Sequence, residues 1–188
     1  MIGGLPKSLV IGGKSYEIRS DFRDVLRIYE AFGDCSLTAQ EQAYICLANI
    51  YPDLEDIPEE YLQEAVDKAY WFVGGGDMPK SEPEKTKMID WKQDENILFP
   101  AINKTAGFEV RETPYMHWWS FLGLFGEIGE GLFSAVMNIR QKKAQGKKLE
   151  KYEAEFYRKN KQLIDIKTPE DIEAEEELNE VFSSLFGE

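Results

Sequence analysis

Residues 115–125 have the sequence YMHWWSFLGLF, which places three large aromatic rings within five positions. At helical spacing, Trp118 and Phe121 share one face, whereas Trp119 points to another. We expect this stretch to be a central core helix of the second half of the chain, with Trp118 in the core. Trp119 has two interpretations, as a core side chain or as part of a groove or subunit interface, where tryptophans concentrate.

On the N-terminal side of this run, residues 1–73 predict a small β-hairpin followed by three helices. The pair Gly12-Gly13 lies between two short apolar stretches and supplies the positive φ angles that a tight hairpin turn requires. Three segments then repeat apolar residues at helical spacing. Their predicted starts are Ser20 as an N-cap, Thr38 in a capping box, and Pro58 at a first helical position.

The rest of the chain divides by composition into three parts. Residues 74–88 combine glycine, proline and charge without an apolar period, which predicts a flexible linker. Residues 89–166 predict a helical part that contains the aromatic core, with Pro100 kinking or interrupting one helix and Thr113-Pro114 opening the aromatic helix. Residues 167–188 predict an acidic C-terminal helix. The fold class is therefore mainly α, a small N-terminal β-hairpin followed by a multi-helix bundle.

Charge and cysteine content limit the classes of partner and compartment. With 22 Lys and Arg against 35 Asp and Glu, the net charge of -13 disfavours a duplex nucleic acid partner. Cys35 and Cys46 are too few for a disulfide framework or a zinc site, so we interpret them as buried thiols of a reducing compartment. The sequence contains neither the pattern of a signal peptide nor an apolar stretch of membrane-spanning length. We expect a cytosolic protein without a membrane partner.

The charge is distributed unevenly near the C-terminus. Residues 140–167 hold ten Lys and Arg against four Asp and Glu, a net charge of +6. Residues 168–188 hold eight acidic residues and no basic one, a net charge of -8. The acidic tail could lie on the basic segment, or the two could be solvated helices with no special relation.

The sequence predicts no catalytic, metal or cofactor site. The single histidine, His117, is expected to lie at the start of the aromatic helix and to hydrogen-bond a backbone or carboxylate group. We do not expect it to act as a general base. Asp90, Asp94 and Glu95 suit the first turns of a helix better than a metal site. The glycines at 123–131 lack the preceding strand and the following Lys-Ser/Thr of a phosphate loop, so we attribute them to close helix packing and a turn.

The last predicted helix has an apolar stripe on a strongly acidic background. Such a stripe needs a partner, either the chain's own domain or another chain. Its residues are Leu178, Val181, Phe182, Leu185 and Phe186. Together with Trp119 they are the candidate protein-binding residues.

One ordered set of residues is typical of a known family, and the tryptophan pair after histidine is its most specific part. The set comprises Asp90, Gln93, Asp94, His117, Trp118, Phe121, Ile139 and Arg140. Over residues 90–166 the chain resembles a family of phage proteins known as gene product fifteen, from the tail modules of phages and prophages of Gram-positive bacteria. The first half matches more weakly, and Pro100 departs from the family pattern. We expect these motif residues to belong to the core.

The resemblance implies a tail assembly chaperone, needed during morphogenesis and not retained in the virion. Such a protein coats the tape measure protein in the cytoplasm of the host cell and helps to recruit tail tube subunits; self-association is left open. Two alternatives are a structural tail or head-tail connector component of the virion and a small nucleic-acid-associated protein. The last would use the basic residues and the rings of Tyr152, Phe156 and Tyr157.

Overall fold

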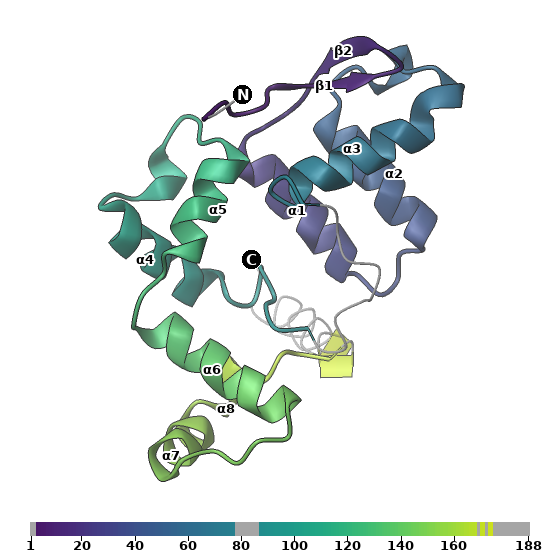
Figure 1. Cartoon of the computed structure of the whole chain (residues 1–188). Coiled ribbons are helices and arrows are strands. Elements are labelled where there is room, and N and C mark those ends of the chain that lie inside the picture. The colour runs from purple at the N-terminus through teal and green to yellow at the C-terminus, as the bar shows by residue number, and fades with distance from the viewer. Residues whose placement is uncertain (1–2, 78–86, 169, 172, 175–188) are drawn as a thin grey trace, which may run out of the picture. The chain divides into compact units, whose positions relative to one another are not determined.

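The computed structural model describes residues 3–77, 87–168, 170–171 and 173–174, and it is mainly α with a two-stranded N-terminal hairpin (Figure 1). The fold class predicted from the sequence is confirmed. The α-helices are α1 (Phe22–Gly33), α2 (Ala39–Ile50), α3 (Leu62–Val73), α4 (Glu95–Ala106), α5 (Trp118–Gly126), α6 (Leu132–Ala144), α7 (Lys151–Lys159) and α8 (Lys161–Ile164). Single 3-10 turns are η1 (Leu54–Asp56), η2 (Glu59–Tyr61) and η3 (Val110–Glu112).

The chain forms two compact units, and their boundaries differ from the division expected at the linker 74–88. Unit 1 comprises residues 1–85 and 90–135, and unit 2 comprises residues 86–89 and 136–188. Helices on both sides of the expected linker therefore belong to unit 1, and the later boundary falls inside α6. Residues 74–77 form a turn on the end of α3, where the amide of Gly76 donates to the carbonyl of Trp71 at 2.9 Å. Residues 78–86 and 175–188, which include the predicted apolar stripe, lie outside the described residues.

The hairpin forms as predicted from the glycine pair. Strand β1 (Ser8–Ile11) pairs antiparallel with β2 (Lys14–Glu17), and Gly12 and Gly13 have φ angles of 54° and 79°. A side chain at Gly12 would also place its Cβ 2.7 Å from the ring of Tyr61. One face of the hairpin is buried and contacts α3.

The first helix begins one residue later than expected, with Asp21 as its N-cap. The carboxylate of Asp21 accepts from the amide of Arg23 at 3.0 Å. Ser20 instead joins an antiparallel pairing with the start of α5, in which its carbonyl accepts from the amide of Trp118 at 2.8 Å and its hydroxyl bonds that of Tyr115 at 2.8 Å. The serine hydroxyl is therefore committed to a residue distant in sequence, and the neighbouring carboxylate takes over the cap.

The other predicted helix starts have mixed outcomes. The capping box of Thr38 at α2 is confirmed. Pro58 precedes η2, so α3 begins only at Leu62. Thr113-Pro114 does not open α5, because Thr113 ends η3 and His117 is the N-cap. Pro100 lies inside α4 without interrupting it, although its ring removes one backbone donor from the helix.

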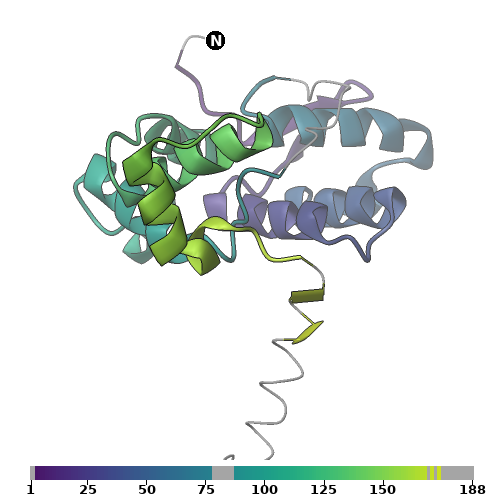
Figure 2. The ribbon, with the colours of Figure 1, turned by 90° about the horizontal axis from the view of Figure 1, so that it is seen from below.

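The core of unit 1 joins α1 to α4 and α5 through aromatic rings. Phe22 stacks on Phe121 with 4.5 Å between the ring centroids, and Trp118 contacts Tyr29 at 5.7 Å. Helix α2 packs along α1 (Figure 2). Trp118 is fully buried, which confirms its predicted place in the core.

The two cysteines differ in exposure, contrary to the expectation that both are buried. Cys35 is exposed in the turn between α1 and α2, whereas Cys46 is buried in α2. Burial raises the pKa of the Cys46 thiol to about 12, so this thiol stays protonated at neutral pH. No disulfide joins them, and no helix of the described residues is long and apolar enough to cross a membrane.

Unit 2 is organised around the buried guanidinium of Arg140. Its Nε donates to the carbonyl of Ile164 at 2.6 Å, and its two terminal nitrogens donate to the carbonyls of Met88 at 3.0 Å and Leu163 at 3.1 Å. One side chain thus holds two separate segments, residue 88 and the end of α8, against α6.

Candidate protein-binding site

His117 fixes the start of α5 through both of its ring nitrogens. Nδ1 accepts from the amide of Trp119 at 3.0 Å, which leaves the proton on Nε2, and Nε2 donates to the carbonyl of Pro6 at 2.9 Å. The ring is buried and meets Phe72 edge-on. These contacts confirm the structural interpretation of the histidine.

Trp119 fastens α5 to the end of α3. Its indole Nε1 donates to the carbonyl of Phe72 at 2.9 Å, and its ring meets Trp71 edge-on with centroids 5.3 Å apart. The side chain is only half-buried. Part of the Trp119 side chain therefore packs against α3, and the remainder is exposed to solvent.

The acidic motif residues build the turn that precedes α4. The carboxylate of Asp90 accepts from the amides of Lys92 at 3.1 Å and Gln93 at 2.8 Å. The carboxylate of Asp94 is buried and accepts from the amide of Asp90 at 3.0 Å. Both carboxylates thus satisfy backbone donors ahead of a helix. Within the ranges that the structure describes, no cluster of three or more His, Cys, Asp or Glu side chains is arranged to hold a metal ion.

Four further motif residues are buried, in two different units, whereas Asp90 and Gln93 are only half-buried and, contrary to expectation, do not belong to the core. Trp118 and Phe121 lie in the core of unit 1. Ile139 and Arg140 are buried in α6 of unit 2. The motif therefore describes how the chain folds, and a binding surface has to be found elsewhere.

An apolar groove lies beside α4, and we call it the α4 groove. Its volume is about 210 Å³. It is lined by Ile97, Pro100, Ala101, Lys104, Ile128, Gly129, Glu130, Gly131, Leu132 and Phe133. Leu132 remains 48% exposed, and Lys104 donates through Nζ to the carbonyl of Glu130 at 3.1 Å, which ties the two walls together. The groove can accept an apolar side chain from a partner.

The two glycines of the α4 groove are not required by the fold. Neither Gly129 nor Gly131 has a positive φ angle, and a Cβ at either position would meet no other atom within 4 Å. The same is true of Gly123 and Gly126, so the attribution of these glycines to close helix packing was wrong, whereas the expected turn is present between α5 and α6. The loop is nevertheless ordered, because the hydroxyl of Ser134 accepts from the amide of Gly131 at 2.9 Å. Bare backbone in such a loop permits close approach by another chain.

The α4 groove was not found from the sequence, although two features pointed to it. Pro100 is unusual inside a helix, and glycine is frequent between α5 and α6. These features are nearly 30 residues apart in the chain. Only the packing of α4 against this loop shows that they line one surface.

A comparison with protein families adds the identity of the chain. Residues 1–166 match the family model described as Bacteriophage Gp15 protein. The chain belongs to the bacteriophage Gp15 protein family. The match begins at residue 1 and includes the N-terminal hairpin, so it is wider than the resemblance over residues 90–166. No curated protein and no solved structure matches the chain.

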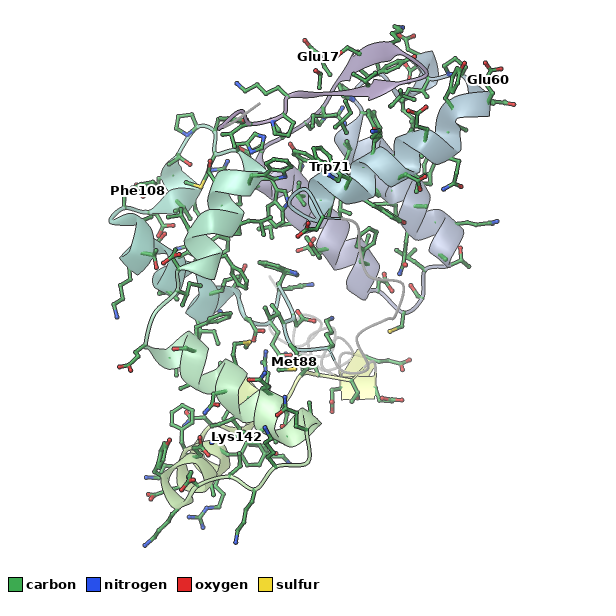
Figure 3. All side chains as sticks on the ribbon, in the orientation of Figure 1. Glu17, Glu60, Trp71, Met88, Phe108 and Lys142 are labelled. Carbon is green, nitrogen blue, oxygen red and sulfur yellow. The ribbon has the colours of Figure 1, made fainter. Side chains whose placement is uncertain are left out.

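This Gp15 family member has a second surface groove, between β1 and α3. Its volume is about 460 Å³, and its lining residues are Pro6, Ser8, Leu9, Val10, Asp67, Lys68 and Trp71. Trp71 lies on α3 (Figure 3), and Val10 is 55% exposed. Both grooves have charged side chains in their lining, but only the α4 groove includes glycines that the fold does not require. We therefore take the α4 groove as the leading candidate site.

Proposed function

We propose that this Gp15 protein is a tail assembly chaperone, a non-virion morphogenesis protein of the host cytoplasm. It binds the tape measure protein and helps to recruit tail tube subunits. The observation that carries this proposal is membership in the bacteriophage Gp15 family over residues 1–166. The tail role itself rests on the resemblance of the motif around His117 to tail-module proteins.

The α4 groove supports a binding function of this kind. A tape measure protein is expected to be a long amphipathic helical polymer, whose apolar side chains recur at intervals of three and four residues. A small apolar groove takes one such side chain at a time, so each contact is weak. Many copies of the chaperone along one polymer then hold it through repeated contacts that release during assembly.

Net charge supports the same proposal. A chaperone that keeps an apolar polymer in solution needs a surface that resists association with itself. The net charge of -13 supplies this repulsion at neutral pH.

The test uses the glycines of the α4 groove in co-expression with the phage's tape measure protein. Gly129→Ala and Gly131→Ala each add a methyl group to a lining residue of the groove without a clash in the chain itself, because their Cβ positions are open. Each should leave folding intact or raise the free energy of unfolding by about 0.4–1 kcal/mol. Each should also reduce the amount of tape measure protein that co-purifies. The matched control is Gly123→Ala, which is equally open but lies outside the groove.

Three results would contradict the proposal or part of it. Failure of the unaltered chain to co-purify with tape measure protein, or to improve its solubility, would reject the chaperone function. Equal binding by the Gly131→Ala and Gly123→Ala variants would remove the α4 groove from the interface. Mass spectrometry of purified virions should detect no copies of the chain, and a stoichiometric copy number would instead indicate a structural tail or connector component.

A further inference from the structure

Unit 2 has an excess of positive charge that its described residues do not neutralise. Three cations are paired, in Lys142–Glu153, Lys143–Asp165 and Lys159–Glu155. Five exposed cations have no ion pair with any residue that the structure describes, namely Lys147, Lys148, Lys151, Arg158 and Lys161. The first four lie on α7 or directly before it, and we call them the basic face.

The basic face is concentrated on and directly before α7. Lys151 and Arg158 are seven residues apart, which is two turns, so they lie on the same side of the helix. Lys147 and Lys148 precede the helix in the turn after α6. Tyr152 is 70% exposed beside Lys151, so an aromatic ring adjoins the cations. An occupant with carboxylates and apolar side chains would satisfy both features.

The chain contains a segment with this chemistry only a few residues further on. Residues 175–188 carry five Glu and no Lys or Arg, and they contain the apolar stripe from Leu178 to Phe186. The fourteen residues 175–188 lie outside the described residues. Because this segment follows α8 in the same unit, its effective concentration near the basic face is far above that of a separate molecule.

We propose that residues 175–188 dock on the basic face of their own chain. Their carboxylates face Lys147, Lys148, Lys151 and Arg158, and their apolar stripe covers Tyr152. Each exposed ion pair contributes little by itself, so the contact is weak and sensitive to salt. While the segment is docked, its apolar stripe is covered, and a competing partner exposes the stripe by displacing the segment from the basic face. The contact goes beyond the proposed chaperone function and does not depend on it.

The first test is hydrogen exchange of the full-length chain, followed in peptides from residues 175–188. At low ionic strength we expect their amides to exchange at least about tenfold more slowly than an unstructured peptide of the same sequence. Combined Lys147→Gln, Lys148→Gln and Lys151→Gln should remove most of this protection, and so should high salt. The matched control changes the same amount of charge on unit 1 by Lys14→Gln, Lys68→Gln and Lys92→Gln, and it should leave the protection unchanged.

Zero-length cross-linking then identifies which molecule supplies the tail. A carbodiimide joins a lysine amine to a carboxylate as an amide, so linked peptides report direct contact. In a mixture of light and ¹⁵N-labelled chains, own-chain docking gives cross-links between peptides of the same isotope. Mixed-isotope cross-links as the main product would overturn the proposal in favour of a second copy.

Three other outcomes would also overturn the proposal. Unprotected amides in the unaltered chain would show that the tail does not dock, and protection that survives the triple change on the basic face would show that it docks elsewhere. Salt-sensitive binding of a DNA or RNA oligonucleotide, lost in that triple variant and accompanied by an unprotected tail, would assign the basic face to nucleic acid.

Discussion

At the scale of single residues, His117 links two parts of unit 1 that are far apart in sequence. Its Nδ1 caps α5, and its Nε2 bonds the carbonyl of Pro6, just before the hairpin. Asn is also a strong N-cap residue but is too short to reach in both directions. Substitution of His117 can therefore separate the stability contributed by the helix cap from that contributed by the bond to Pro6.

We expect His117→Asn to lower the free energy of unfolding by about 1 kcal/mol, because the bond to Pro6 is lost while the cap is kept. His117→Ala loses the cap as well and should cost about 1 kcal/mol more. Urea unfolding followed by tryptophan fluorescence measures both. Equal losses in the two variants would show that the cap contributes nothing.

At the scale of elements, α6 and α7 are joined by the carboxylate of Glu153, which is 2% exposed. It accepts from Lys142 at 2.5 Å and from the side chain of Asn138 at 2.9 Å, both on α6. Lys142 is visible on α6 in Figure 3. The hydrogen bond from Lys142 is the main cause that lowers the pKa of Glu153 below its ordinary value of 4.5, and backbone donation from Glu150 adds to it.

Because the folded state depresses this pKa, Glu153 stabilises the α6–α7 pair above pH 4.5 and loses that contribution as the pH falls through the folded value. We expect Glu153→Gln to be less stable than the unaltered chain at pH 7. The difference should shrink steadily as the pH falls below 4.5. Hydrogen exchange of α7 at a series of pH values, corrected for the intrinsic rate, measures it. A difference that is independent of pH would contradict this assignment.

At the scale of the whole molecule, each of the two units is stabilised internally by its own set of contacts. The aromatic cluster of Phe22, Trp118 and Phe121 belongs to unit 1, whereas the carbonyl partners of Arg140 belong to unit 2. Lysine has the same charge as arginine but lacks the planar fork that reaches several carbonyls at once. A substitution at Arg140 should therefore act locally.

We expect Arg140→Lys to speed amide exchange in residues 87–89 and in α8 by about tenfold or more, because donors to three carbonyls are lost. Exchange in α1 and α5 should change little. Peptide-resolved hydrogen exchange of the full chain distinguishes the two regions. A uniform increase across both units would show that the chain opens as one cooperative body.

The sequence by itself determined the fold class, the hairpin, the capping box at Thr38 and the burial of Trp118, because these depend on residues within a few positions of one another. The motif around His117 also pointed to the phage family that residues 1–166 match. Tertiary structure decided the features that join distant segments. Asp21 caps α1 in place of Ser20, because Ser20 pairs with residues almost 100 positions away. Part of the Trp119 ring is buried, because its indole donates to the carbonyl of Phe72. The α4 groove exists only where Pro100 and Gly129 come together, since shape and burial depend on contacts that no local pattern encodes.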